Sequence, residues 1–395
     1  MELALLLQSK QSTIPYHIQE LTFELGKKQL PLLTIPGDGS RSVIDKIAIV
    51  LKNCIPSLRK LSLSYDGRYG ALPHLEYTKL AASRHGTIDP SFSRVTQLEL
   101  YLSREENPIP LIRFICSFPS LEVLKMHSGC EGQIDGEILV MPADVQNLIL
   151  PTSLKTLQLG GSENVASEGL HLFYQWLGST GIPASLSTLS IYRVNIGGFS
   201  QPLTTLDPEI EPYLHRCSTL SFLHLGFDTG YIAPLSTAFF DLSAPQNLTH
   251  LAISIRNIVQ DDPDLMLLEL IRKMLTTLTS PLLHQITFNV FGSGFRVLPD
   301  QWDALDTLLA TPKFTAVQVE LVVPFSDSTI DDGTSEEDLT KARECFSKCD
   351  SQERLTVIRA PFVMKTRTWR ETPEEAKQFE DYDVIDWVCR RLSLW

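Results

Sequence analysis

The hydrophobic positions of the chain recur in one form: an apolar residue, two others, a second apolar residue, one other and a third apolar residue. Eight copies fit well: Leu58-Leu61-Leu63, Val95-Leu98-Leu100, Leu121-Leu124-Met126, Leu154-Leu157-Leu159, Leu186-Leu189-Ile191, Leu220-Leu223-Leu225, Leu248-Leu251-Ile253 and Leu283-Ile286-Phe288. The second and third apolar residues are two positions apart, which places them on one face of a β-strand. The pattern therefore predicts a series of similar short strands.

Looser copies flank these eight, namely Ile18-Leu21-Phe23 before them and Phe314-Val317-Val319 and Leu355-Ile358-Ala360 after them. We call the second apolar residue of each copy its marker. Successive markers are separated by between 26 residues (Leu98 to Leu124) and 41 residues (Val317 to Ile358). One interval accommodates a strand, a helix and two loops, a length typical of solenoid repeats.

The segments between the strands show the spacing of amphipathic helices. Apolar residues recur at steps of three and four in residues 42–53, 167–177, 265–278 and 300–309. Asp264 and Asp300 stand where helix N-caps are expected. Strands that alternate with helices at this period predict a parallel sheet with helices on one side.

These features predict an α/β leucine-rich-repeat solenoid, an arc or horseshoe with a concave parallel sheet and convex helices. About ten or eleven irregular units occupy residues 1–373. Residues 374–395 turn from acidic to apolar. Because the last unit of a solenoid exposes the edge of its core, we interpret this segment as a C-terminal cap.

A short junction precedes several strands, as in Pro151-Thr152-Ser153-Leu154. The proline ends the preceding element, and a small polar residue begins the turn into the strand.

Four cysteines fall just ahead of a strand: Cys54, Cys116, Cys217 and Cys349. Their shared position predicts small buried core residues rather than ligands. Cys345 and Cys349 are four apart on a predicted helix, but no nearby histidine or cysteine completes a four-ligand site. We therefore expect no metal and no cofactor.

Charge and apolar content narrow the classes of partner. The net charge is −13 at pH 7, and such a surface repels phosphate backbones, so we expect no nucleic acid partner. No apolar run approaches the length of a membrane span, so we expect no membrane partner.

Scattered cysteines without a secretory signal predict a cytoplasmic or nuclear location. Acidic residues concentrate between positions 326 and 338; we interpret them as a solvated insertion, with a docking site for a basic partner as the alternative.

Three phrases, at residues 15–23, 55–63 and 118–126, resemble the irregular leucine-rich repeats of fungal F-box proteins, and the likeness covers residues 14–360. The resemblance implies the substrate-binding region of a ubiquitin ligase adaptor, in which an N-terminal F-box docks on the Skp adaptor of a cullin ligase. Only residues 1–14 precede the repeats here. We therefore expect Skp adaptor binding only if an F-box lies upstream of Met1.

Residues between the apolar strand positions face the concave surface in this prediction, where aromatic and polar side chains suit a protein-binding face. The candidate partner-binding residues are Tyr101, Lys125, His127, Tyr192, Phe222, His224 and His250. The alternative for each is an ordinary solvated strand position.

A second class of function is catalysis. Asp228-Thr229-Gly230 matches the motif of aspartic proteases, which need two such carboxylates sharing a proton. No second copy of the motif occurs, so we interpret Asp228 as part of a turn and expect a non-enzyme. The leading hypothesis is a protein-recognition scaffold. Its alternatives are an orphan structural or inhibitory scaffold unrelated to ubiquitin, and a hydrolase using Asp228.

Overall fold

The computed structural model describes residues 19–25, 58–65, 93–102, 109–128, 145, 148–160, 176–177, 183–194, 214, 217–228, 241–256, 265–290, 299–326 and 336–362. Its strands are β1 (Glu20–Leu25), β2 (Lys60–Tyr65), β3 (Gln97–Leu102), β4 (Val123–Ser128), β5 (Thr156–Gly160), β6 (Thr188–Val194), β7 (Phe222–Asp228), β8 (His250–Arg256), β9 (Gln285–Val290), β10 (Gln318–Ser326) and β11 (Leu355–Phe362). Its helices are α4 (Ile109–Cys116), α8 (Leu265–Thr277), α9 (Pro299–Leu309), α10 (Glu336–Cys345) and α11 (Ser347–Ser351), with a 3-10 turn, η6 (Pro312–Phe314).

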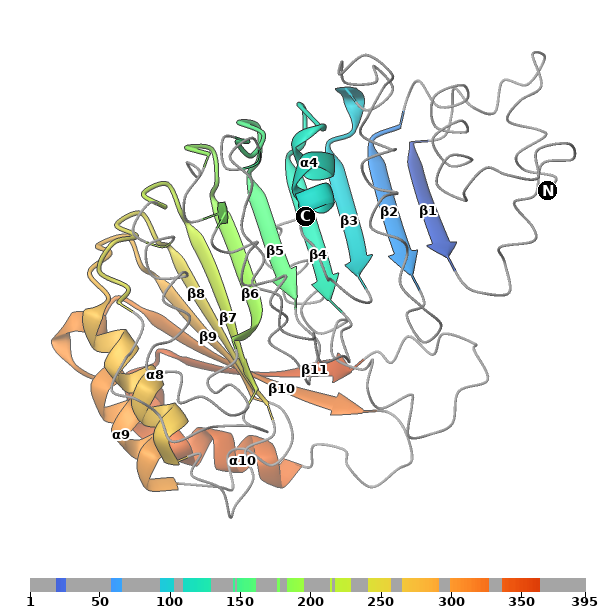
Figure 1. Cartoon of the computed structure of the whole chain (residues 1–395). Helices are drawn as coiled ribbons and strands as arrows, with labels where there is room; N and C mark the ends of the chain where they lie inside the picture. Colours follow the sequence, from blue (N-terminus) through green and yellow to red (C-terminus); the bar gives the residue numbers. More distant parts are fainter. Residues whose placement is uncertain are drawn as a thin grey trace, which may run out of the picture. The chain divides into compact units, whose positions relative to one another are not determined.

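The strands form one open sheet. Across the described residues it has 11 strands in the order of the sequence, from β1 to β11 (Figure 1). Neighbouring strands from β1 to β6 and from β8 to β11 pair in parallel. The expected α/β architecture with a parallel sheet is therefore confirmed.

The chain divides into two compact units, each of which we describe by itself. Unit 1 comprises Met1–Arg193, Thr205–Leu223 and Ser243–Asn247, and it holds β1 to β5, most of β6, and α4. Unit 2 comprises Val194–Thr204, His224–Leu242 and Leu248–Trp395, and it holds most of β7, β8 to β11, and α8 to α11.

The register confirms the markers of the regular copies from β2 to β6. In unit 1, Leu61 pairs with Leu98, Leu98 with Leu124, Leu124 with Leu157, and Leu157 with Leu189. These five leucines are at most 1% exposed. The repeat pattern thus aligns the same side chain on every strand and stacks the markers into one continuous row of the core.

Two markers of the looser copies are wrong. The structure pairs Val319, not Val317, with the marker of β9, and it pairs Leu355, not Ile358, with Val319. These strands carry apolar residues at consecutive positions, so the pattern fits their sequence in more than one place. Hydrogen bonding to the neighbouring strand selects the register, and a slip of one residue would exchange the two faces.

The helices of unit 2 are close to those expected. α8 and α9 cover the predicted segments and pack against each other (Figure 1). α9 begins at Pro299, so Asp300 lies in the first turn and is not the N-cap. Proline suits the first helical position, because its missing N–H would have no partner there. Among the helices that the structure describes, none has both the length and the apolar character that a membrane span requires.

Other expectations on helices have mixed outcomes. Cys345 ends α10 and Cys349 lies in the separate helix α11, so the expected single helix through both is wrong. Trp176 and Leu177, from the predicted helix at 167–177, are helical and 1% exposed. Residues 42–53 and the predicted cap at 374–395 lie outside the described residues.

Candidate functional site

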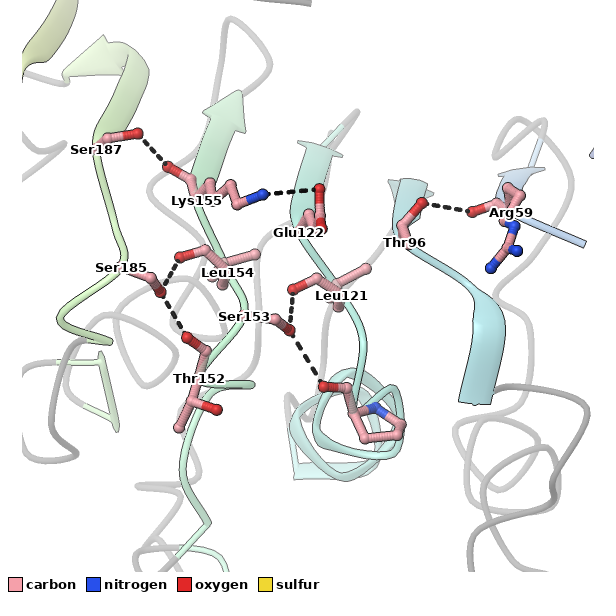
Figure 2. Close-up of polar contacts among 11 residues, drawn as sticks. Arg59, Thr96, Leu121, Glu122, Thr152, Ser153, Leu154, Lys155, Ser185 and Ser187 are labelled. Atoms are coloured by element: carbon pink, nitrogen blue, oxygen red, sulfur yellow. Dashed lines mark hydrogen bonds and ion pairs between the residues drawn. The ribbon is translucent and has the colours of Figure 1, made fainter.

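Serine hydroxyls tie two successive strand turns of unit 1, those before β5 and β6, to the turn before each (Figure 2). Ser153 Oγ donates to the carbonyl oxygens of Pro119 and Leu121, at 3.1 and 2.8 Å. Ser185 repeats this arrangement one strand later, at 2.6 and 2.7 Å. These serines are the small polar residues of the junctions seen in the sequence. They hold the strand starts in place, and with them the side chains of the sheet face.

The residues next in sequence continue this ladder through their backbones. Lys155 N donates to Glu122 O at 2.8 Å, and Ser187 N donates to Lys155 O at 2.9 Å. Lys155 Nζ also lies 3.2 Å from Glu122 Oε2 (Figure 2). Both side chains of this ion pair are about half exposed, so water screens it and it adds little stability. The turn row is thus a solvated edge of the sheet.

The first candidate site is a row of residues that directly follow the markers in unit 1. Strand register aligns its members, which we call the unit 1 row: Ser62, Glu99, Lys125, Gln158 and Ser190. Because successive strand residues point to opposite sides, these side chains lie on the face opposite the buried markers. We call this the polar face.

Burial of the unit 1 row departs from expectation. Ser62, Gln158 and Ser190 are only 4%, 5% and 3% exposed, and Glu99 and Lys125 are half-buried. These three side chains are thus neither solvated nor open to a partner. Neighbouring strands lie about 4.8 Å apart, so short side chains are enclosed by those beside them. Gln158 Oε1 is buried and accepts no hydrogen bond.

Unit 2 carries a buried polar cluster of three residues, His224, Ser254 and Asn289, each 2% exposed. Asn289 Nδ2 donates to Ser254 Oγ at 3.0 Å, and Ser254 Oγ lies 2.8 Å from His224 Nε2. Burial lowers the pKa of His224 from 6.5 to about 4, so the ring is neutral at pH 7. The tautomer of the neutral ring sets which of Ser254 Oγ and His224 Nε2 donates in this contact. Asn289 Oδ1, like Gln158 Oε1, accepts no hydrogen bond from the part of the chain that the structure describes.

Ser254 Oγ and His224 Nε2 are as close as a catalytic serine and its general base usually are. A nucleophile must also meet a substrate, and 2% exposure of both side chains prevents this. The cluster is therefore a structural network that fixes strand packing.

A second histidine arrangement lies at the start of β8 and β9. The rings of His250 and His284 meet edge to face, with centroids 4.3 Å apart and planes at 76°. Thr249 Oγ1 lies 3.1 Å from His250 Nδ1, and Leu282 O lies 3.3 Å from His284 Nδ1. His250 is half-buried and His284 is exposed. Burial, then the nearby charge of His284, lowers the pKa of His250, while a hydrogen bond to Gln285 opposes the shift.

The predicted partner-binding residues fall into three groups. Lys125 and His250 are half-buried and so partly accessible. Phe222 and His224 are each 2% exposed, so the expected exposure of these two is wrong. The described side chains on both faces of β7 are buried, since Leu223, Leu225 and Phe227 are also at most 1% exposed. The side chains of three others lie outside the described part of the chain: Tyr101, His127 and Tyr192.

Sequence reasoning missed three functional candidates among the described residues. Side chains alternate along a strand, and this alternation predicts on which face a residue lies but not how deeply it is buried. Gln158 and Asn289 were therefore recognised only as strand positions. His284 precedes its strand and was overlooked. A signal was present, since adjacent copies each place a histidine within two residues of their first apolar position.

Cys217, Cys345 and Cys349 are buried as expected, whereas Cys116 is half-buried. Burial raises the pKa of Cys116, Cys217 and Cys349 to about 12 and that of Cys345 to about 11. Such thiols are protonated at pH 7 and are poor nucleophiles. Within the described ranges, no three or more histidine, cysteine or acidic side chains gather as a metal site. Cys54 lies outside these ranges.

Asp228, the candidate of the hydrolase hypothesis, is the last residue of β7 and not part of the following turn. Its side chain, Thr229 and Gly230 lie outside the described residues. In comparisons with known proteins, no family model matches the chain, and no curated protein matches it.

Proposed function

We propose that this chain is a leucine-rich-repeat solenoid, of arc or horseshoe form, that binds another protein on the polar face of its sheet. Three features support the repeat class. The markers are aligned strand by strand. The strands follow the order of the sequence. Serine hydroxyls link equivalent turns about thirty residues apart.

The observation that carries the binding proposal is the pairing in register of two half-buried charged side chains on the polar face, Glu99 of β3 and Lys125 of β4. Both side chains are partly accessible, so a partner with complementary charges can form hydrogen-bonded ion pairs with them. Lys125 also pairs in register with Gln158, whose burial helps to hold the lysine in place.

On this proposal the chain is a recognition protein and not an enzyme, and it acts in the cytoplasm or nucleus. Its resemblance to fungal F-box proteins extends the proposal. The repeats would hold the substrate of a ubiquitin ligase, and an F-box upstream of Met1 would supply the link to the Skp adaptor.

Affinity purification with quantitative mass spectrometry from the native cell tests this proposal, using three baits: wild type, Lys125→Ala and Lys155→Ala. Lys125 lies on the polar face, whereas Lys155 lies on the solvated turn row and serves as the matched control. We expect one partner to be recovered with the wild type and the control. Its affinity for Lys125→Ala, measured afterwards with purified partner, should fall by about 1–2 kcal/mol, or roughly 5- to 30-fold.

Equal binding to all three baits would contradict the polar-face proposal. Ubiquitination of the partner that depends on this chain would support the ligase extension. A partner whose ubiquitination and abundance do not change when the chain is deleted would instead favour a scaffold unrelated to ubiquitin.

A further inference from the structure

The polar face of unit 2 is more deeply buried than an uncovered sheet face should be. Six of its side chains in β7 to β10 are at most 2% exposed, and we call them the unit 2 patch: His224, Ala252, Ser254, Thr287, Asn289 and Val322. Strand register places Ala252 beside Thr287, and Asn289 between Ser254 and Val322. The patch is therefore one continuous area of the sheet.

The side chains of neighbouring strands do not account for this burial. In the unit 1 row, the long side chain of Glu99 stands beside Ser62, and that of Lys125 stands beside Gln158. Most side chains of the unit 2 patch are short and equally high, so their outer atoms should stay open to solvent. Ala252 shows the difference most clearly, because it has only a methyl group and is 1% exposed.

The described helices of unit 2 cover the opposite face. Phe288 of β9 lies on the same face as the marker Ile286, because the two residues are two positions apart. The ring centroids of Phe288 and Phe346 are 5.8 Å apart, and those of Phe346 and Trp302 in α9 are 5.7 Å apart. The helices α8, α10 and α11 all pack on α9. These helices thus form a layer on the marker face, and a further segment must cover the unit 2 patch.

The chain that follows β11 is long enough to reach the patch. Residues 257–264, 291–298 and 327–335 each join a strand to the next helix, and residues 363–395 are longer than any of these. Parallel strands end on the same side of a sheet, and only about 15 Å separates β11 from β8. Extended chain over residues 363–382 spans about 60 Å. Residues 383–395 can therefore reach every strand of the patch.

The sequence of residues 383–395 fits such a surface. Steps of three and four predict an amphipathic helix, whose apolar side holds Val384, Ile385, Val388, Leu392 and Trp395. The opposite side holds Asp386, Arg390 and Ser393. A helix packs closely on a sheet where the side chains of the sheet are short, as most of those in the unit 2 patch are.

We propose that residues 383–395 dock as an amphipathic helix on the unit 2 patch of the same molecule. Removal of the apolar side of this helix from water drives the docking, and the same contact excludes water from the patch. The docking does not depend on the proposed function. If a partner binds the polar face as proposed above, it must displace this helix to reach the patch.

Alkylation of a thiol placed in the patch tests the proposal in the full chain. Ala252→Cys adds a single sulfur atom, and its modification by N-ethylmaleimide is followed by digestion and mass spectrometry. We expect slow modification in the Ala252→Cys chain, because a covered thiol reacts only after local opening. Addition of Leu392→Asp places a charge on the apolar side of the predicted helix and should raise the rate by at least about tenfold.

Ser393→Asp is the matched control, because it adds the same charge on the opposite side of the same predicted helix. Its rate should stay within about twofold of that of the Ala252→Cys chain. Cys349 of α11 is 0% exposed and reports in the same molecule whether unit 2 remains folded, so its slow modification should not change. Leu392→Ala gives the deciding comparison if Leu392→Asp unfolds unit 2, and it should also raise the rate at the patch.

Fast modification in the Ala252→Cys chain itself would overturn the proposal, because the patch would then be open. Equal rates for Leu392→Ala and Ser393→Asp would also overturn it, since another segment would then cover the patch. A rate that falls as the protein concentration rises would place a second copy of the chain on the patch and would equally contradict docking within one molecule.

Discussion

Single polar residues on the sheet face differ in whether their hydrogen bonds are satisfied. Ser254 accepts from Asn289 and contacts His224, whereas Gln158 Oε1 and Asn289 Oδ1 find no donor among the described residues. A buried neutral histidine and a buried unpaired amide oxygen have different consequences. The histidine makes the free energy of unfolding depend on pH, whereas the unpaired amide oxygen lowers it by a similar amount at every pH.

His224 should make the protein sensitive to mild acid. Its folded pKa of about 4 lies below the ordinary value of 6.5, so protons bind the unfolded state first. Stability from the neutral ring is fully present above pH 6.5 and is lost as the pH falls towards 4. Between pH 7.5 and pH 5 this loss is about 2 kcal/mol. Urea unfolding of wild type and His224→Gln at both pH values measures it. The variant should lose less stability on acidification, and equal losses would show that His224 does not titrate on unfolding.

Gln158→Met should raise the free energy of unfolding by about 1 kcal/mol, because it keeps the volume and removes the unpaired buried oxygen. Gln97→Met is the control, since Gln97 is exposed on β3 and its replacement should change stability by less than about 0.5 kcal/mol. Chemical denaturation of both variants measures the effect. A loss of more than about 1 kcal/mol in Gln158→Met would mean that the amide is satisfied in solution.

At the scale of elements, each strand depends on its neighbours through the marker and the junction serine. The marker fills the core between strand and helix, and the serine ties one turn to the carbonyls of the one before. In unit 2, a hydrogen-bonded contact joins two helices that are far apart in the sequence. Asp306 of α9 is 0% exposed and accepts from Lys348 N at 2.7 Å and from Cys349 N at 3.0 Å, which fixes the start of α11.

Leu157→Ala should cost about 2–5 kcal/mol, because the leucine is 0% exposed and its loss leaves a cavity in the row of markers. Leu282→Ala is the matched control: Leu282 is 52% exposed, so the same truncation there should cost less than about 1 kcal/mol. Thermal or urea unfolding compares the two variants. Equal losses at the two positions would mean that the marker row is not the core.

At the scale of the whole molecule, the division into two units has a consequence for stability. In repeat proteins each strand unit interacts mainly with its neighbours, so a local defect spreads only a short distance. The markers aligned from β2 to β6 form one such neighbourhood in unit 1. In unit 2, helices α8 to α11 pack on one another, and α10 and α11 pack on β11, which forms a second neighbourhood.

Hydrogen exchange followed by mass spectrometry should show this locality. In Leu157→Ala, amides of β4, β5 and β6 should exchange faster, by a factor that grows with the loss of stability there, while amides of β9 and β10 change much less. The reciprocal variant Trp302→Ala removes a 0% exposed side chain of α9 and should accelerate exchange in unit 2 first. Uniform acceleration in both variants would indicate a single cooperative unit.

The sequence by itself determined the strand-and-helix alternation, the parallel order and the markers of the regular copies, because a buried position repeated at one period leaves a direct trace in the pattern of apolar residues. The tertiary structure alone decided the register of β10 and β11, since consecutive apolar residues fit either alignment until the neighbouring strand supplies its hydrogen bonds. It also decided which polar side chains are buried. Gln158 and Gln97 are both strand glutamines in sequence, yet only the first is enclosed by its neighbours. The approach of His250 to His284 likewise depends on strand pairing, which brings residues thirty-four apart to within ring contact.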